Sequence, residues 1–318
     1  MKKSPMLVAV LALVAVLALA LLFGRKHPTG AEREEGPAQR KTEPQRGVAE
    51  DRGVDRKPAV AADSTKPAVP AVPEKARLTA QQTLAAMNLP QNIRIIVGLA
   101  PDKSYQKRSK AAHSLVRHLT TNEILGIYVF LESGYDDYKN ELQPLEFESI
   151  RNDTLEALLR QEELPGDLGK QMLKMYGDPA QNVVWRDYCI QHFKPYCEAK
   201  WKDAAAATDD PEWADITNAY WRATRETGNT MAGTALIGMR LVADKYPALS
   251  KEQVAKRAQE LAVDDACGEA SRITALRVCA QMGQKDVVPQ ARVLSQTGQN
   301  IMLRCAAIAT IGDLGDRS

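Results

Sequence analysis

The four histidines are the first side chains to consider for acid–base or metal chemistry, and their spacing favours neither. His27 lies in a stretch rich in Pro and charged residues. His113 and His118 are five residues apart, so on one helix they would point to different faces. His192 falls on an apolar stripe, which is typical of a core or boundary histidine. The chain contains no H-E-x-x-H, G-x-S-x-G or G-x-G-x-x-G sequence.

Two further patterns resemble catalytic motifs only superficially. The segment 164–170 has the wrong glycine spacing for a phosphate loop, and Gln171 stands where Ser or Thr should hold Mg²⁺, so we interpret it as a turn between helices. The acidic pairs lie beside Gly or Pro, where turn and N-cap carboxylates are common: Asp136-Asp137, Asp209-Asp210 and Asp264-Asp265. We therefore predict a protein that is not an enzyme and has no cofactor or metal.

The cysteines and tryptophans favour packing over chemistry. The five cysteines are an odd number without C-x-x-C spacing, and we expect buried thiols, with Cys279 and Cys305 in apolar positions of a repeat. Packing between helices explains most of the four tryptophans, although one exposed member could anchor a partner. These are Trp185, Trp201, Trp213 and Trp221.

Charge excludes one large class of partner. The net charge of the 318 residues is +2, and basic and acidic residues are mixed throughout the chain. Nucleic-acid binding normally requires a basic stripe or patch. We therefore predict no nucleic-acid partner.

The first 24 residues predict a membrane anchor. Lys2 and Lys3 precede 18 apolar residues, 6–23, which would make about 27 Å of helix, enough to cross a bilayer core. The alternative is a cleaved signal peptide, but the only A-x-A triplet near the end, 18–20, lies inside the apolar run. We predict a single-pass transmembrane signal anchor over 1–24. Its N-terminus would be cytoplasmic and the rest of the chain exported to a periplasmic or other extracytoplasmic space.

Residues 25–77 predict a disordered linker. The segment is rich in Pro, Ala and charged residues, and the tetrapeptide 57–60 recurs at 66–69. Such a composition favours extended polyproline II segments without a packed core. Some 50 residues of coil would span on the order of 40 Å.

Residues 78–318 read as helices joined by short loops. Capping boxes are predicted at Thr79, Thr120 and Ser250, and Asp178-Pro179 predicts a further helix start. Apolar residues recur every three or four positions behind these caps. The one strand-like run, 93–97, lies between helices and is interpreted as helical.

Two segments near the end of the chain match at an offset of 32 residues. Arg272 aligns with Arg304, Leu276 with Ile308, and Gly283 with Gly315. Weaker matches occur upstream, where 186–190 aligns with 304–308 and 234–236 with 274–276. A period between 20 and 50 residues indicates stacked units that are each too small to bury their own apolar face.

These segments resemble HEAT repeats of the bacterial HEAT-like type. The similarity lies in the endings with Ile308, Ile311 and Leu314-Gly315-Asp316, and in the segment Asp286-Val287-Val288-Pro289. In that family the first helix ends in an apolar-Gly turn, and the second opens with Asp and carries Arg six residues later. Asp286 and Arg292 would then form the family's ladder between repeats. With this assignment, the helix that contains Arg304 is the first helix of a repeat whose second helix is missing.

The resemblance implies a right-handed α-solenoid of helix pairs over 78–318. We predict that this all-α body is a membrane-tethered interaction scaffold that binds another protein or peptide. In HEAT-like stacks the second helices line the concave face, so the candidate contacts are Lys251, Lys256, Arg257, Gln290 and Ser295. Two alternatives remain: a HEAT-like lyase acting on bilin–protein adducts, and a structural spacer of the cell envelope.

We predict that residues 1–24 stay attached to the mature protein as its anchor. Mass spectrometry of the membrane fraction should detect a peptide that includes Met6–Gly24. A mature N-terminus at or after Leu21 in a soluble extract would contradict this prediction.

Overall fold

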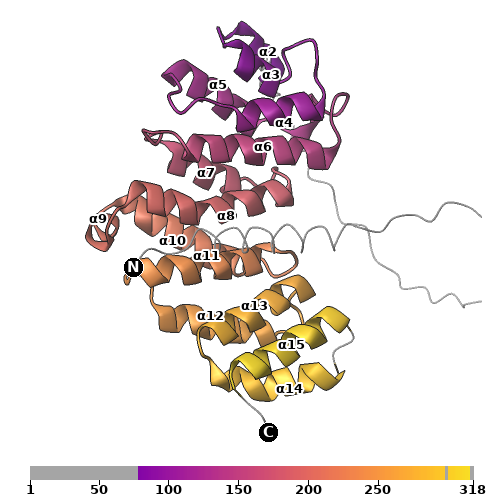
Figure 1. The fold of residues 1–318 in the computed structure, drawn as a ribbon, viewed down its shortest axis with the longest axis vertical. Coiled ribbons are helices and arrows are strands. Elements are labelled where there is room, and N and C mark those ends of the chain that lie inside the picture. Colours follow the sequence, from indigo (N-terminus) through magenta and orange to yellow (C-terminus); the bar gives the residue numbers. More distant parts are fainter. Residues whose placement is uncertain (1–77, 298–299, 316–318) are drawn as a thin grey trace, which may run out of the picture. The chain divides into compact units, whose positions relative to one another are not determined.

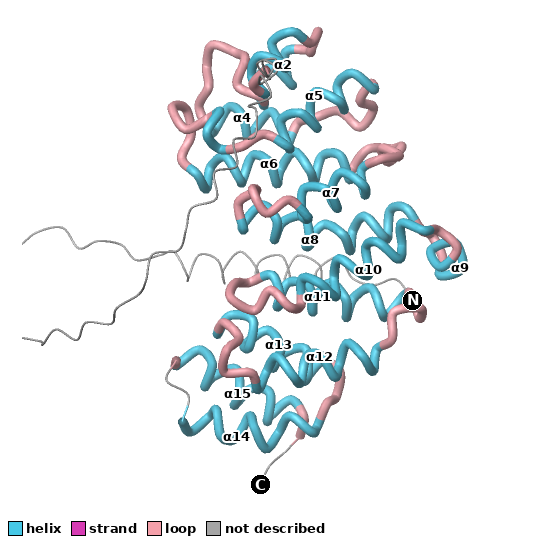
Figure 2. Tube along the Cα trace, turned by 180° about the vertical axis from the view of Figure 1, so that it is seen from behind, coloured by secondary structure: helices cyan, strands magenta, loops and turns pink. Residues whose placement is uncertain are grey.

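A computed structural model describes residues 78–297 and 300–315. The predicted anchor and linker, 1–24 and 25–77, lie outside this range. The described residues form fourteen α-helices and two short 3-10 helices without a strand, which confirms the all-α prediction (Figure 2). None of these described helices is both long and apolar enough to span a bilayer.

Most helices belong to one of two sets that alternate along the chain (Figure 1). Set A consists of α5 (Thr121–Glu132), α7 (Leu168–Gly177), α10 (Pro211–Ala223), α12 (Lys251–Val263) and α14 (Val288–Thr297). Set B consists of α4 (Tyr105–His113), α6 (Pro144–Leu159), α8 (Val183–Lys200), α11 (Met231–Lys245), α13 (Glu269–Gln281) and α15 (Ile301–Asp313). The remaining elements are α2 (Ala80–Ala86), α3 (Gln91–Ile96), η1 (Tyr135–Asp137), α9 (Ala204–Thr208) and η2 (Lys285–Val287).

Each set A helix packs against the set B helix that follows it, and the set B helices pack against one another in chain order. The pairs are therefore α5–α6, α7–α8, α10–α11, α12–α13 and α14–α15. Contacts from α4 through α6, α8, α11 and α13 to α15 join neighbouring pairs. The 32-residue repeat equates α13 with α15, which are direct neighbours in set B.

This pairing differs from the repeat frame expected from sequence. The expected frame paired the helix of Arg272 with the helix that begins near Asp286, and left the helix of Arg304 alone. In the structure α15 packs on α14, which precedes it, and α13 packs on α12. Asp286 lies in η2 and Arg292 on α14, so both precede or form the first helix of the α14–α15 pair and not the second helix of a pair that begins with α13. Hydrogen bonds from arginines of set B helices to the helices before them give the physical reason for the observed pairing.

Five of the set B helices carry an arginine that donates a hydrogen bond to the preceding helix. Each bond ends on a backbone carbonyl in that helix's last turn, where carbonyls have no partner within the helix. The Nε–O distances are 2.8 Å for Arg108 to Ile96, 2.8 Å for Arg186 to Tyr176, 3.3 Å for Arg272 to Ala262 and 3.2 Å for Arg304 to Ser295, and Arg151 Nη2 donates to Leu131. A cation at the negative end of the helix dipole adds a favourable charge interaction.

The glycines aligned by the repeat end their helices in the left-handed conformation. Gly283 has φ +70° and Gly315 has φ +73°. After α13, the amide of Gly283 donates to the carbonyl of Ala280 at 3.1 Å and that of Gln284 to Cys279 at 2.9 Å. This is a Schellman motif, which satisfies two carbonyls at the helix end. The apolar-Gly turn expected from the sequence is therefore present.

The local helix signals were mostly correct. Capping boxes are present at Thr79 and Thr120, and the Ser250 side chain accepts from the amide of Gln253. The run 93–97 lies largely in helix α3, as predicted. The prediction at Asp178 was wrong, because the carboxylate of Asp178 accepts from the amide of Ala180 at 2.9 Å in a turn, and α8 begins five residues later behind Asn182.

Burial of α15 differs from the expectation for two residues. Leu276 is fully buried, but its counterpart Ile308 is 57% exposed. Cys305 is also exposed, whereas Cys189, Cys197, Cys267 and Cys279 are buried free thiols as predicted. The reason is positional: α13 is covered by α15, and no further set B helix follows α15 within the described range.

Replacing Gly283 by Ala should lower the free energy of unfolding by about 1 kcal/mol, because an L residue at positive φ is strained. A Cβ there would meet no atom within 4 Å, so backbone strain is the only cost. Gly177, the last residue of α7, also has open space around it and lacks a positive φ, so Gly177→Ala is the matched control. Urea unfolding followed by circular dichroism measures both. If both substitutions changed the free energy of unfolding equally, the positive φ of Gly283 would not be the cause.

Candidate partner-binding groove

All five residues predicted to contact a partner lie on set A helices, which are the first helices of their pairs and not the second helices on which the prediction placed them. Lys251, Lys256 and Arg257 are on α12, and Gln290 and Ser295 are on α14. Lys256 and Arg257 line one cavity together, whereas Lys251 lines a different one. The structure therefore brings two of the five residues into one site.

That site is a groove between α10 and α12, which we call the Trp221 groove. Trp221 comes from α10, and α12 supplies the other walls: Gln253, Lys256, Arg257 and Glu260. Its volume is about 320 Å³. It combines one indole ring, two cations, one carboxylate and one amide.

Trp221 differs from the other tryptophans in its exposure. Trp185, Trp201 and Trp213 are buried in the core, while Trp221 is half-buried at the surface. An aromatic ring with one apolar face in reach of solvent is a typical anchor for a partner side chain. The sequence offered a signal for this, because Trp221 lies one position beyond the apolar stripe formed by Trp213, Ile216 and Tyr220.

The two cations of the groove have different roles. Arg257 is held in place, since its Nη2 donates to the carbonyl of Thr224 at 2.8 Å and its Nη1 lies 2.9 Å from Glu260. Thr224 is the C-cap of α10, so Arg257 joins α12 to the end of α10. Lys256 is exposed and forms no ion pair with any described residue. Lys256 is therefore the cation that is free to meet an anionic partner.

The remaining predicted contacts are engaged in other interactions or lie apart from the groove. Lys251 forms an ion pair with Asp244 at 2.9 Å, in a pocket lined by α11, the start of α12 and the end of α13. Ser295 donates its hydroxyl to the carbonyl of Arg292 at 2.7 Å, and its own carbonyl accepts from Arg304. Gln290 is half-buried on α14. Ser295 thus has a role in joining α14 to α15.

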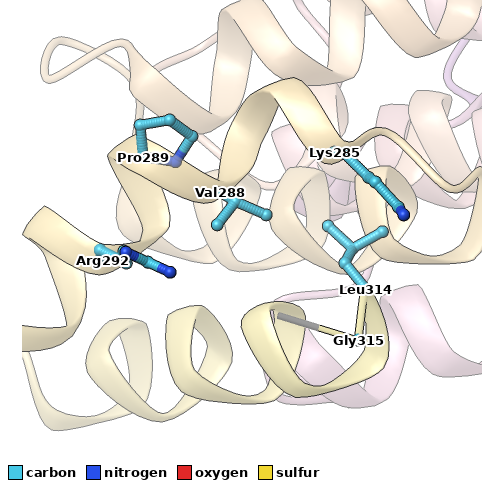
Figure 3. A pocket seen from close by; sticks show the side chains of 6 residues that line it. All are labelled: Lys285, Val288, Pro289, Arg292, Leu314 and Gly315. Carbon is cyan, nitrogen blue, oxygen red and sulfur yellow. The ribbon is translucent and has the colours of Figure 1, made fainter. Parts of the chain in front are cut away.

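A larger pocket, of about 700 Å³, lies at the last helix pair (Figure 3). Figure 3 shows side chains from η2 and α14 on one side and the end of α15 on the other: Lys285, Val288, Pro289, Arg292, Leu314 and Gly315. Gly315, which lines this pocket, is the last described residue before 316–318, and we do not place the candidate site here.

His192 is a buried histidine, in agreement with the prediction of a core or boundary position. Its Nε2 lies 2.8 Å from the side-chain oxygen of Asn152, and burial lowers the pKa of His192 to about 4. The imidazole is therefore neutral near pH 7 and donates to the amide oxygen. Its outer edge borders a cavity of about 500 Å³ between α6 and α8.

A Ser–His–Asp cluster on α4 and α6 has the wrong order of hydrogen bonds for nucleophilic catalysis. The Ser109 hydroxyl donates directly to Asp153 at 2.9 Å. Nδ1 of His113 lies 2.8 Å from the carbonyl oxygen of Ser109, which can only accept, so this nitrogen carries the proton. An activated serine requires an imidazole nitrogen that accepts the hydroxyl proton. We interpret the cluster as a polar contact between the two helices.

Comparisons of the chain with protein-family models, with curated proteins and with solved structures gave no match. The function of the chain is therefore inferred from its own residues and their arrangement.

Acid should destabilise the protein partly through His192. The pKa of His192 is lower in the folded than in the unfolded state, so the unfolded chain binds the proton first as the pH falls. The folded protein therefore loses stability between about pH 6.5 and about pH 4. The loss should reach about 3 kcal/mol. His192→Gln keeps a donor for Asn152 and should reduce the loss of stability in this window. His118→Gln, at an exposed position, should leave the wild-type profile unchanged; urea unfolding at several pH values measures all three.

Proposed function

We propose that this protein is an interaction scaffold that binds another protein or peptide through the Trp221 groove. The observation that carries the proposal is the half-buried Trp221 beside the unpaired Lys256, on a body whose other three tryptophans are in the core. Hot spots of protein interfaces are enriched in tryptophan and arginine and lie in well-packed pockets from which the bound partner excludes water. The groove offers both residue types together.

The chemistry of the groove indicates the kind of segment that it binds. The indole face suits an apolar or aromatic side chain, and Lys256 suits a carboxylate next to it. Gln253 adds an amide that can donate to and accept from a peptide backbone. We therefore propose a partner segment with an aromatic or aliphatic anchor residue flanked by Asp or Glu.

We further propose how the body is built and placed. The α5–α6 to α14–α15 pairs would form a right-handed, HEAT-like α-solenoid, which the order of contacts between set B helices supports. The apolar run 6–23 would anchor the chain in a membrane, with the body exported and the linker giving it reach. The protein would then act by recruiting its partner near the membrane, without catalysing a reaction.

A photo-crosslinking amino acid at position 256, introduced in intact cells, should capture the partner. The same label at Lys110, an exposed lysine on α4, is the matched control and should capture far less. Trp221→Ala should weaken binding of the captured partner at least about 10-fold, as expected for an anchor residue. Lys256→Glu should weaken it as well.

Both variants should keep the wild-type far-UV circular dichroism spectrum, which separates loss of binding from loss of fold. Equal capture at positions 256 and 110, or an affinity that neither substitution changes, would show that the groove is not the binding site. Turnover of a substrate by the purified protein would overturn the scaffold proposal itself.

A further inference from the structure

Helix α15 exposes an apolar stripe along its whole length. We define the α15 stripe as Ile301, Cys305, Ile308 and Gly312, all of which are exposed. Ile301 is 69% and Ile308 57% exposed, and the neighbouring Met302 is 60% exposed. The spacing of four, three and four residues places the stripe on one face of the helix, in the pattern of a coiled-coil seam.

The repeat shows what this face does one unit earlier. Ile273, Leu276 and Ala280 of α13 are the counterparts of Cys305, Ile308 and Gly312. Leu276 is fully buried, and Ile273 and Ala280 pack against the core. The opposite side of α13 faces α11, where the Ser271 hydroxyl lies 3.2 Å from the amide of Gly233. The stripe is thus the surface on which a set B helix receives the next helix.

No described residue covers the stripe. The surface at the other end of the body is polar and is therefore not complementary to it. A repeat stack normally ends in a unit with a polar outer face. The first described helices have such a face, because Gln82 on α2 and Gln106, Lys107 and Lys110 on α4 are exposed. Head-to-tail stacking of copies would bury these polar side chains against an apolar surface. The stripe is therefore better matched by another apolar stripe.

We propose that the α15 stripe binds the α15 stripe of a second copy of this chain, with the two helices antiparallel about a two-fold axis. Antiparallel seams alternate their positions, so Ile301 of one copy would lie opposite Gly312 of the other, and Cys305 opposite Ile308. A large side chain then meets a small one in every layer. Gly312 has no atom within 4 Å of the place where a Cβ would be, so there is room for the isoleucine.

Charge permits this pairing. The stripe carries no charged residue, and the charged residues of α15, Arg304 and Asp313, lie outside it. Two identical stripes can therefore meet without bringing like charges into contact. One helix face per copy buries less than the roughly 800 Å² per partner of a standard interface, so we expect a dissociation constant in the micromolar range.

The experiment uses the full-length chain, purified in detergent micelles, at protein concentrations from about 1 to about 100 µM. Sedimentation equilibrium should show a protein mass that doubles across this range. Ile308→Asp should keep the chain at the monomer mass over the same range. Leu145→Asp is the matched control, because Leu145 is 64% exposed on α6 and should still allow the mass to double. Unchanged circular dichroism of both variants shows that the fold is intact.

Cys305 provides a second, independent readout. The reaction of Cys305, the exposed thiol of the described residues, with a maleimide should slow as the protein concentration rises from about 1 to about 100 µM, because the seam then buries the thiol, and Cys305→Ser should abolish the labelling. A wild-type chain that stays monomeric at all concentrations would overturn the proposal. So would a dimer that Ile308→Asp leaves intact, or a monomer in which Cys305 resists maleimide, because another segment of the same chain would then cover the stripe.

Discussion

The arrangement of this protein depends on hydrogen bonds from arginine side chains to the ends of neighbouring helices. A short helix leaves its last carbonyls without partners, and burying them unpaired would cost more than a typical hydrogen bond contributes. Five set B helices supply the missing donor, each from an arginine that reaches back to the helix before it. One side chain therefore caps a helix and fixes how the next helix packs on it.

Arg151 shows why this solution needs further support. Its guanidinium is almost fully buried, and burial lowers the pKa of Arg151 and raises that of Glu148. Their separation of 3.1 Å opposes both shifts, and the guanidinium also lies 4.0 Å from the ring centre of Trp185. A buried cation is tolerated only when it is paired and bonded in this way. Trp185 thus helps to hold the arginine that joins α6 to the end of α5.

The same kind of bond connects the scaffold to the proposed binding groove. Arg257 joins α12 to the carbonyl of Thr224 at the end of α10, and these are the two helices between which the groove lies. The wall that carries Lys256 is therefore positioned by the contact that holds the helices together. The α15 stripe lies on another helix pair, so a partner in the groove and a second copy on the stripe would not compete for the same residues.

The sequence by itself determined the features that depend on neighbours along the chain. Helix starts at Thr79 and Thr120 follow from capping, and the left-handed turns at Gly283 and Gly315 follow from the repeat, because both depend on residues only a few positions away. The match of Arg272 with Arg304 also marked the residues that later proved to cap the preceding helices. These signals were sufficient for the all-α class and for the period of the repeat.

Only the tertiary structure decided which surfaces are covered. Leu276 and Ile308 occupy the same place in the repeat, yet one is buried and the other exposed, because only α13 has a following set B helix among the described residues. The same is true of the groove: the sequence selected Lys256 and Arg257 on α12, but not their position beside Trp221 or the bond that fixes Arg257. Burial depends on which distant segment packs against a residue, and local periodicity carries no information about that segment.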